Sequence, residues 1–312
     1  DASKSRGLGD VYKRQISVKT VIVSWKIYAL RGLLRLLSRK LSRYPNTIST
    51  RLIKLCYSIT PIADVDIVIS GGANLAPLNL ALSKLLKVKN IHLSSPRDWR
   101  VSDFTAYITS TRISKSSSNL VPEIVPNQFD PKTCKELGTR FISEKGIEGI
   151  KFSLLILGGD GIGYFYSKSE WLDLINNFSS FCKLRQTNPL FITSTRTPIE
   201  VEELIKEKFD VSMSVLYHSE KARGKFDHLL YVADNIFVTE DSSTMLSEAV
   251  SSGKKVISIF PQNINAPEKY LQIITKYQGL EFIERCSIEN IDKFTFPRET
   301  NIPVSYTHLT LP

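Results

Sequence analysis

Short apolar runs alternate along the first half of the chain with longer segments whose apolar residues recur at helical spacing. The runs that favour strands are residues 19–24, 66–69, 90–93 and 104–108, with a weaker one at 123–125. Helical spacing follows two of them, over residues 30–41 and 77–86. Strands that alternate with helices are typical of a parallel sheet, so the pattern predicts an α/β domain.

The same alternation restarts after an irregular polar stretch at 126–149. The strands expected there are residues 153–157, 190–193, 236–239 and 256–260, with a weaker one at 211–216. The helices expected between them are residues 168–185, 198–208, 226–233, 243–252 and 267–277. This order predicts a doubly wound sheet. We therefore expect two Rossmann-like domains, over residues 16–149 and 150–303.

Both ends of the chain resemble translated sequencing adapters. The strings are GDVYKRQ at residues 9–15 and VSYTHLTLP at residues 304–312. Such segments are set aside before the fold is considered. We therefore expect a non-native leader over residues 1–15, a first domain truncated at its start, and a non-native tail over residues 304–312. An unusual native tail is the alternative.

The net charge of +10 indicates an anionic partner, which is a nucleic acid, a lipid surface or a phosphorylated small molecule. No nucleic-acid-binding motif accompanies the charge, so nucleic acid is not expected. The four cysteines form no CxxC pair, which argues against a metal site and a disulfide framework. No apolar run of about 18 residues occurs, so we expect a cytoplasmic protein.

Candidate chemistry gathers where the strands of the second half end, because ligands of doubly wound sheets bind at that edge. Gly158, Gly159 and Asp160 follow residues 153–157. Glycines let backbone N–H groups approach a phosphate closely. A tight turn between strand and helix is the alternative interpretation.

Two further strand ends carry compatible side chains. Ser194, Arg196 and Thr197 follow residues 190–193, and a guanidinium there could bind a phosphate through two N–H groups. The alternative is a helix capped by Thr197 beside a surface arginine.

The third strand end, after residues 236–239, provides Asp241, Ser242 and Ser243. Hydroxyl groups at a helix N-terminus can hold an anion. Glu248 lies further along the same helix, where its carboxylate could accept hydrogen bonds from a ribose diol. An acidic cap on an ordinary helix remains the alternative.

The first half offers polar candidates for an acceptor site after two of its strands. These are Gly71, Gly72, Asn74 and Arg97. Each is also compatible with a turn or an exposed surface position. His92 lies within an apolar strand, which favours a core histidine over a catalyst.

The helix expected near residues 30–43 carries leucines on one face and basic residues elsewhere. The leucines are Leu30, Leu33, Leu34, Leu37 and Leu41. Basic amphipathic helices can lie on anionic membranes. The favoured alternative is that the leucines pack on the domain's own sheet.

Four strings resemble the mitochondrial fission ELM-type family across nearly all of residues 16–301. They are ISGGANLAPLNLALSK, LLILGGD, ITSTRTP and VTEDSSTMLSEAVSSGKKV. The resemblance implies a GT-B-like arrangement of the two domains with a cleft between them. Residues 243–253 also resemble the donor-site helix of the peptidoglycan N-acetylglucosaminyl transferase. By that likeness Glu248 would hold the ribose, and Ser242 and Ser243 the diphosphate.

The resemblance leads to a functional hypothesis with one main rival. The hypothesis is a glycosyltransferase that uses a nucleotide-diphosphate sugar as substrate, needs no cofactor or metal, and acts on a cell-envelope acceptor at the inner membrane surface. The rival is a non-catalytic scaffold or membrane-associated factor. A nucleotide-sugar epimerase is a third possibility that would need converging acidic and histidine residues. Family members begin with a glycine-rich loop that is absent here, so no catalytic residue is assigned.

Overall fold

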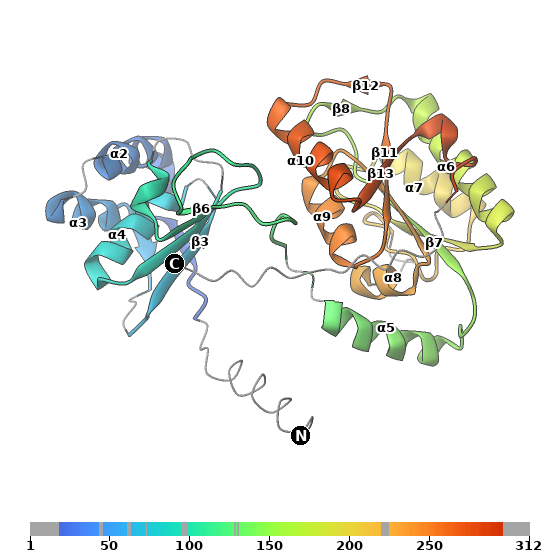
Figure 1. The fold of residues 1–312 in the computed structure, drawn as a ribbon, viewed down its shortest axis with the longest axis horizontal. Coiled ribbons are helices and arrows are strands. Elements are labelled where there is room, and N and C mark those ends of the chain that lie inside the picture. Colours follow the sequence, from blue (N-terminus) through green and yellow to red (C-terminus); the bar gives the residue numbers. More distant parts are fainter. Residues whose placement is uncertain are drawn as a thin grey trace. The chain divides into compact units, whose positions relative to one another are not determined.

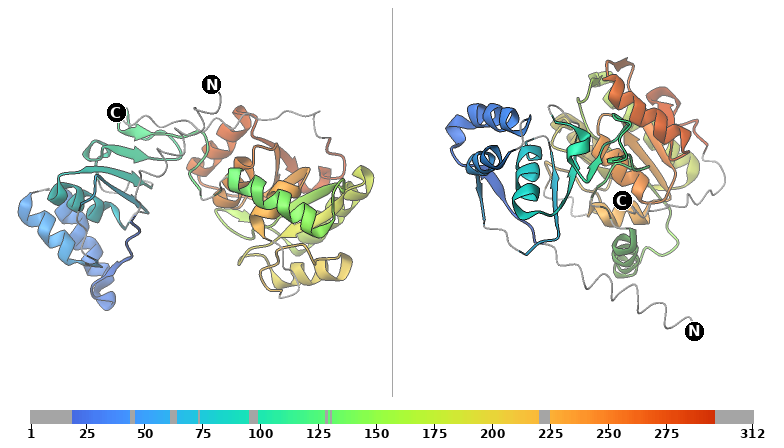
Figure 2. Two further views of the ribbon diagram at one scale, coloured as in Figure 1. Left: turned by 90° about the horizontal axis from the view of Figure 1, so that it is seen from below. Right: turned by 60° about the vertical axis from the view of Figure 1, so that its left-hand side comes forward.

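Two compact units make up the fold, and they divide between Leu120 and Val121 (Figures 1 and 2). The computed structural model describes residues 19–43, 46–60, 64–72, 74–94, 99–127, 129, 131–219 and 225–295. Each unit has its own parallel sheet, which confirms the predicted α/β class with two Rossmann-like domains. The cleft between the units stays a prediction.

The sheet of the first unit has four parallel strands in sequential order. They are β3 (Ile67–Gly71), β4 (Lys89–Leu93), β5 (Ala106–Ile108) and β6 (Asn119–Leu120). The strand predicted at 123–125 is wrong. Its backbone is bound elsewhere, because the N–H of Val125 donates to the Tyr277 hydroxyl (2.9 Å) and the carbonyl of Pro122 accepts from Lys276.

A separate antiparallel pair lies beside this sheet. It consists of β1 (Val23–Trp25), shorter than predicted, and the unpredicted β2 (Tyr57–Ile59). The rings of Trp25 and Tyr57 stack with their centroids 4.5 Å apart. The pair therefore holds the ends of the intervening helical segment together.

Three helices complete the first unit. They are α2 (Arg31–Arg43), α3 (Thr47–Leu55) and α4 (Ala76–Leu86), with short 3-10 turns at η1 (Tyr28–Leu30) and η2 (Val101–Asp103). The unpredicted α3 begins with a reciprocal capping box between Asn46 and Ser49. Leu34 and Leu41 of α2 pack on the core, whereas Leu30, Leu33 and Leu37 remain exposed. The favoured interpretation, in which these five leucines all pack on the domain's own sheet, is therefore wrong for Leu30, Leu33 and Leu37.

A buried polar network lies between α4 and the sheet. The side-chain amide of Asn79 donates to the Ser70 hydroxyl (2.8 Å), and that of Asn90 donates to the side-chain oxygen Oδ1 of Asn79 (2.9 Å). The Ser70 hydroxyl lies 2.7 Å from Nδ1 of His92, whose pKa burial lowers to about 4. His92 is thus a neutral core residue, as the apolar strand predicted.

The second unit has five parallel strands in the order β13-β11-β10-β7-β9. They are β7 (Phe152–Ile156), β9 (Asn188–Ile192), β10 (Asn235–Thr239), β11 (Val256–Phe260) and β13 (Ile283–Ser287). The first four were predicted. The fifth strand predicted, 211–216, is wrong, since that segment contributes only a bridge from Val215 to Ile192.

Helices cover both faces of this sheet. They are α5 (Pro131–Lys145), α6 (Lys168–Arg185), α7 (Ile199–Lys208), α8 (Phe226–Val232), α9 (Ser243–Ser251) and α10 (Glu268–Gly279), with a 3-10 turn at η3 (Ile288–Asn290). In Figure 1, α6 lies on one face, and α9 and α10 on the other. The short strands β8 (Tyr164–Phe165) and β12 (Asn263–Ile264) pair antiparallel at one end.

The division between the units comes earlier than the predicted position near residue 150. The stretch 126–149, expected to be irregular, contains α5, which packs on α8. Gly138 lies directly against the ring of Tyr231, where a β-carbon would overlap with it. Because α5 is part of the core of the second unit, that unit begins before it.

Candidate functional site

The three strand ends singled out in the second half meet at one edge of the sheet. Strands β7 and β10 are neighbours, although the chain passes from β7 to β9 on the other side before it returns to β10. The strand order therefore reverses between β7 and β10, and ligands of such sheets bind at this point. The loops after β7, β9 and β10 come together there.

The glycines after β7 are required by close packing. A β-carbon on Gly158 would overlap with the Asp241 carboxylate, and one on Gly159 would overlap with the backbone carbonyl of Arg196. The N–H of Gly158 donates to the Thr239 hydroxyl (2.8 Å), and the N–H of Gly159 donates to Oδ2 of Asp241 (3.0 Å). The tight-turn interpretation thus explains the glycines, and the turn also directs a backbone N–H at a carboxylate.

Asp241 is the centre of the cluster. Its side chain is 0% exposed, and Oδ2 accepts from both the Gly159 N–H and Nη2 of Arg196, the latter at 2.7 Å. Oδ1 has no hydrogen-bond partner among the described residues. Burial raises the pKa of this carboxyl to about 6, although the Arg196 guanidinium and the hydrogen bonds act in the opposite direction.

Ser194 and Thr197 tie the loop after β9 to the glycine turn. The Thr197 hydroxyl donates toward the carbonyls of Leu157 (3.0 Å) and Gly158 (2.6 Å), and the Ser194 hydroxyl donates to Gly158 (3.1 Å). Thr197 is not the helix cap, because α7 is capped at Pro198 without a side-chain bond. These two hydroxyls position Arg196, whose side chain is 36% exposed.

Asp160, Ser242 and Ser243 lie at the margin of the cluster. Asp160 is exposed and accepts from the backbone N–H of Tyr166 (3.0 Å). Ser242 caps α9 through a long bond from the N–H of Met245 (3.5 Å), and Ser243 is the first residue of that helix. The N-terminus of α9 therefore opens beside Asp241 with its serine hydroxyls half-buried.

Glu248 stands apart from the other predicted residues. It is half-buried on α9, and burial, with the negative charge of Asp227 as a second cause, raises its pKa. In the part of the chain that the structure describes, no hydrogen bond or ion pair links it to Arg196 or Asp241. The structure thus brings Gly158, Gly159, Ser194, Arg196, Thr197 and Asp241 together, and Glu248 lies outside this cluster.

Sequence reasoning missed a buried ionic network directly below Asp241. Glu240 is fully buried, and Arg285 of β13 binds both of its carboxylate oxygens, at 2.6 and 2.8 Å. The hydroxyls of Tyr164 (3.0 Å) and Ser258 also donate to this carboxylate, and Tyr270 donates to the backbone carbonyl of Glu240. The adjacent acidic pair after β10 was the only signal in the sequence. The network fixes the end of β10 and with it Asp241.

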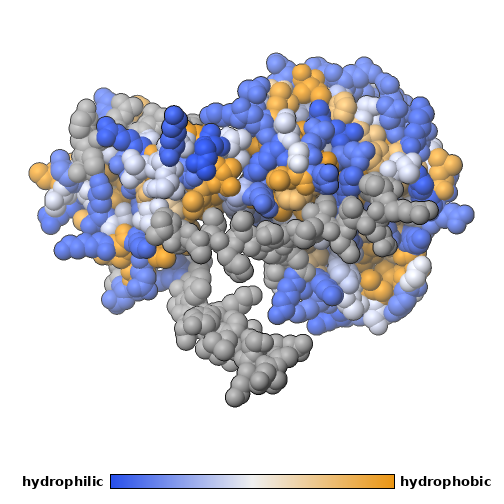
Figure 3. Space-filling view, in the orientation of Figure 1, coloured by the Kyte–Doolittle hydropathy of each residue, from blue (hydrophilic) through white to orange (hydrophobic). Residues whose placement is uncertain are grey.

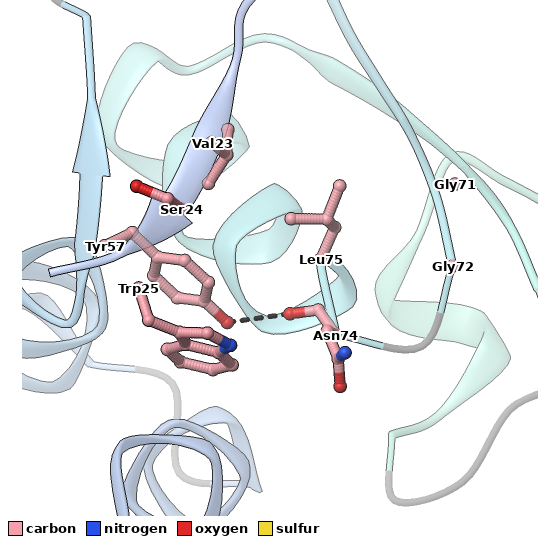
Figure 4. A pocket seen from close by; sticks show the side chains of 8 residues that line it. All are labelled: Val23, Ser24, Trp25, Tyr57, Gly71, Gly72, Asn74 and Leu75. Atoms are coloured by element: carbon pink, nitrogen blue, oxygen red, sulfur yellow. Dashed lines mark hydrogen bonds between the residues drawn. The ribbon is translucent and has the colours of Figure 1, made fainter. Parts of the chain in front are cut away.

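The first unit has a cavity of about 320 Å³ at the carboxyl end of β3 (Figure 4). Three of the residues predicted for an acceptor site line it, namely Gly71, Gly72 and Asn74. Figure 4 shows the stacked rings of Trp25 and Tyr57 beside Asn74, with the Tyr57 hydroxyl donating to the Asn74 carbonyl (2.7 Å). The fourth predicted residue, Arg97, lies outside the described residues.

Two other kinds of site are absent from the described ranges. They contain no cluster of three or more histidine, cysteine or acidic side chains arranged for a metal ion. None of the helices described there has the length and apolar character needed to cross a membrane.

Several solved structures are similar to this chain at low sequence identity. UDP-GlcNAc 2-epimerase from Methanocaldococcus jannaschii is 12% identical with a TM-score of 0.47, covering 86% of this chain and 75% of that one. The S. aureus MnaA-UDP structure is 11% identical with a TM-score of 0.44, covering 86% and 70%. The glycosyl transferase family 9 structure from Veillonella parvula is 11% identical with a TM-score of 0.41, covering 85% and 69%. All three TM-scores are below 0.5.

Sequence comparison gives a relative and a family. The uncharacterized protein RP120 of Rickettsia prowazekii is 31% identical over 122 residues, which are 37% of this chain and 33% of that protein. The match therefore spans about a third of that relative's length. The sequence model described as Mitochondrial fission ELM1 matches residues 2–284, which is most of the chain. The chain belongs to the mitochondrial fission ELM1 family.

Proposed function

We propose that the second unit binds a nucleotide-diphosphate sugar where β7, β9 and β10 end, and that the protein transfers the sugar to a cell-envelope acceptor. One observation carries the proposal. The Gly159 N–H and the Arg196 guanidinium already converge on one carboxylate oxygen, that of Asp241. A backbone donor and a guanidinium that meet in this way form an anion-binding pair.

The diphosphate would exchange with the Asp241 carboxylate at this pair. Arg196 can turn toward solvent, because about a third of its side chain is exposed. The N-terminus of α9 opens at the same edge and favours negative charge through its dipole. Ser242 and Ser243 would then lie beside the phosphates. The guanidinium and the helix N-terminus together offset the charge of the diphosphate without a metal ion.

Glu248 is the proposed partner of the ribose. Its half-buried carboxyl lies on the helix whose first residues would bind the phosphates. An ionised carboxylate can accept hydrogen bonds from both hydroxyls of a diol. Burial and Asp227 disfavour ionisation of Glu248 in the free protein, and two donated hydrogen bonds would favour it.

A non-catalytic, membrane-associated scaffold is the second candidate. Exposed leucines and basic residues on α2 favour it, since a surface with apolar and positively charged side chains is suited to an anionic membrane. The two candidates differ in whether the second unit responds to nucleotides.

The first test measures the effect of Arg196→Gln on ligand binding. Wild-type protein is screened by thermal shift against UDP, GDP, CMP, ADP and their sugars, and a stabilisation of several degrees by one nucleotide is expected. Calorimetric titration with that ligand should then show affinity about 10- to 100-fold lower in Arg196→Gln, because a charged hydrogen bond is lost. Arg140→Gln, an exposed arginine of α5, is the matched control. A normal affinity in Arg196→Gln would exclude this arginine from the site.

The second test concerns Glu248→Ala. The nucleotide sugar should bind about tenfold more weakly, because the ribose loses its acceptor. Glu207→Ala removes an exposed glutamate of α7 and should leave affinity unchanged. Deoxyribose analogues give a second readout, because wild type should lose affinity for them while Glu248→Ala should not distinguish them from the ribose forms. Equal discrimination by both proteins would place the ribose elsewhere.

A further inference from the structure

A second cavity of the first unit is lined by two arginines and two aromatic rings. Its volume is about 330 Å³, and its lining includes Trp25, Tyr28, Arg31, Arg35 and Asn74. Trp25 and Asn74 also line the cavity at the carboxyl end of β3, so the two cavities share these residues. Aromatic surface beside a few charged and polar groups is the usual lining of a small-molecule site.

The two arginines have donors that are free to bind an anion. Arg31 and Arg35 lie one helical turn apart on α2, so their guanidinium groups can act on one ligand. The Arg31 guanidinium lies 4.7 Å from the centroid of the Tyr28 ring and donates to the Tyr28 hydroxyl, which uses one of its N–H groups. Nε of Arg35 is buried without a hydrogen-bond partner among the described residues. A buried donor without a partner costs stability, and an anion in the cavity would remove that cost.

The charge around the cavity favours an anion with two negative charges. Residues 19–60 contain no aspartate or glutamate, and no ion pair joins Arg31 or Arg35 to a described carboxylate. Figure 3 shows hydrophilic residues, in blue, at the edge of the first unit where Figure 1 draws α2 and α3, and Lys40 and Arg51 are exposed on these helices. A phosphate monoester carries close to two negative charges at neutral pH and would offset both guanidinium groups. A carboxylate would offset only one.

Trp25 gives the cavity a flat apolar wall. Its indole stacks on the Tyr57 ring with the centroids 4.5 Å apart, and the Tyr57 hydroxyl donates to the backbone carbonyl of Asn74 (Figure 4). These contacts hold Trp25 and Asn74 in place before a ligand binds. An indole can pack against the apolar face of a ring, and the exposed side-chain amide of Asn74 can bind ring hydroxyl groups.

We propose that this cavity binds a phosphate monoester of a sugar, with the phosphate on Arg31 and Arg35 and the sugar ring on Trp25. Such a ligand combines a dianion with a ring that bears hydroxyl groups, which are the two features that the lining matches. Every residue involved belongs to the first unit, so the binding does not depend on the nucleotide site.

A role for this ligand in sugar transfer rests on the proposed function. The sugar phosphate would then be the acceptor. One of its ring hydroxyls would bond to the transferred sugar and lose its proton, and the nucleoside diphosphate would leave.

Calorimetric titration of the full chain, without nucleotide, tests the site. Glucose 1-phosphate is the probe, inorganic phosphate lacks the ring, and glucose lacks the charge. We expect glucose 1-phosphate to bind more tightly than inorganic phosphate, and glucose to show no measurable binding. Arg35→Gln should weaken the binding of glucose 1-phosphate about 10- to 100-fold, because a charged hydrogen bond is lost. Arg35→Lys should restore only part of the affinity, since lysine lacks the planar fork. Arg51→Gln, an exposed arginine of α3, is the matched control.

The contact with the ring has a variant of its own. Trp25→Leu should lower the affinity for glucose 1-phosphate to that for inorganic phosphate. Its affinity for inorganic phosphate should stay at the wild-type value, which also shows that the first unit is folded, and circular dichroism checks the folding independently. A Trp25→Leu protein that still prefers glucose 1-phosphate would remove the ring from this wall.

Arg196→Gln separates this site from the nucleotide site. It should bind glucose 1-phosphate normally, and Arg35→Gln should bind nucleotide normally. Three outcomes would overturn the sugar-phosphate site, namely no binding of glucose 1-phosphate, normal affinity in Arg35→Gln, and tighter binding of decyl phosphate, which would assign the arginines to a lipid phosphate. Nucleotide binding that persists in any of these cases would leave the proposed function intact. Glucose 1-phosphate binding without any nucleotide effect would reject only the proposed function.

Discussion

The side chain of Asp241 is fully buried, and its two carboxylate oxygens have different surroundings. Oδ2 has two donors, whereas Oδ1 has none in the described ranges. The guanidinium of Arg196 is partly in water, which weakens its compensation of the buried charge. Desolvation is therefore the larger effect, and the pKa rises to about 6. The ionised carboxylate costs stability at neutral pH.

Asp241→Asn should reveal this cost through its dependence on pH. Below about pH 3 the carboxyl is neutral in both the folded and the unfolded chain, so the substitution should change stability little. Between about pH 4 and pH 6 the unfolded chain is ionised while the folded carboxyl still holds its proton, so the wild type loses stability relative to the variant over this range, and the difference levels off above about pH 6. The difference should reach about 2 to 3 kcal/mol at pH 7.5.

Urea unfolding at pH 4.5 and pH 7.5 measures the effect. Asp173→Asn, an exposed aspartate of α6, should show no comparable change with pH. A difference between wild type and Asp241→Asn that stays constant with pH would mean that the carboxyl titrates normally.

Sequence reasoning singled out three strand ends that the structure brings to one edge of the sheet, and it could not assign hydrogen-bond partners within them. Gly158, Arg196 and Asp241 were singled out because the carboxyl ends of parallel strands share an edge. Gly158 must be a glycine because the carboxylate of Asp241 packs against it. Asp241 comes 83 residues later, so the residues around Gly158 in the sequence give no sign of this contact. Glu240 was passed over for a similar reason. In the sequence a buried glutamate cannot be distinguished from an exposed one, and only the structure shows that Arg285 binds Glu240.

At the scale of elements, Arg285 joins β13 to the end of β10 across β11. Both of its bonds go to Glu240, which is completely buried. Arg285→Gln would leave an uncompensated buried carboxylate, which costs about 3 to 5 kcal/mol. Urea unfolding should show that loss. Lys255→Gln removes an ion pair from the residue before β11 to the exposed Glu284 of β13 and should cost less than about 1 kcal/mol. Similar losses in both variants would contradict the structural role of Glu240.

Element prediction failed where local composition disagreed with tertiary packing. Pro131 and Gly138 made the stretch before β7 look like a loop. In the structure Pro131 is the first residue of α5, where proline is tolerated, and Gly138 gives Tyr231 the space to approach. β13 was missed because three of its five residues are polar or charged, and it pairs only at the edge of the sheet. The central strands, which are mostly apolar, were found.

At the scale of the whole molecule, the two units have separate hydrophobic cores. Separate cores predict two unfolding transitions. The three tryptophans allow each transition to be followed alone, because Trp25 and Trp99 belong to the first unit and Trp171 to the second. Trp171→Phe should report only the first transition by fluorescence, and Trp25→Phe with Trp99→Phe only the second. A bound nucleotide should raise the midpoint temperature of the second transition and leave that of the first unchanged. A single transition seen by both variants would indicate one cooperative unit.

Strand β3 ends the sheet of the first unit, and no described strand pairs with its outer side. Its side chains add to the exposure, since Ile69 is 65% exposed. A strand with an open row of N–H and carbonyl groups and aliphatic side chains is a template for edge-to-edge association. An added strand, from another segment or from a second molecule, would therefore extend the sheet of the first unit at this edge.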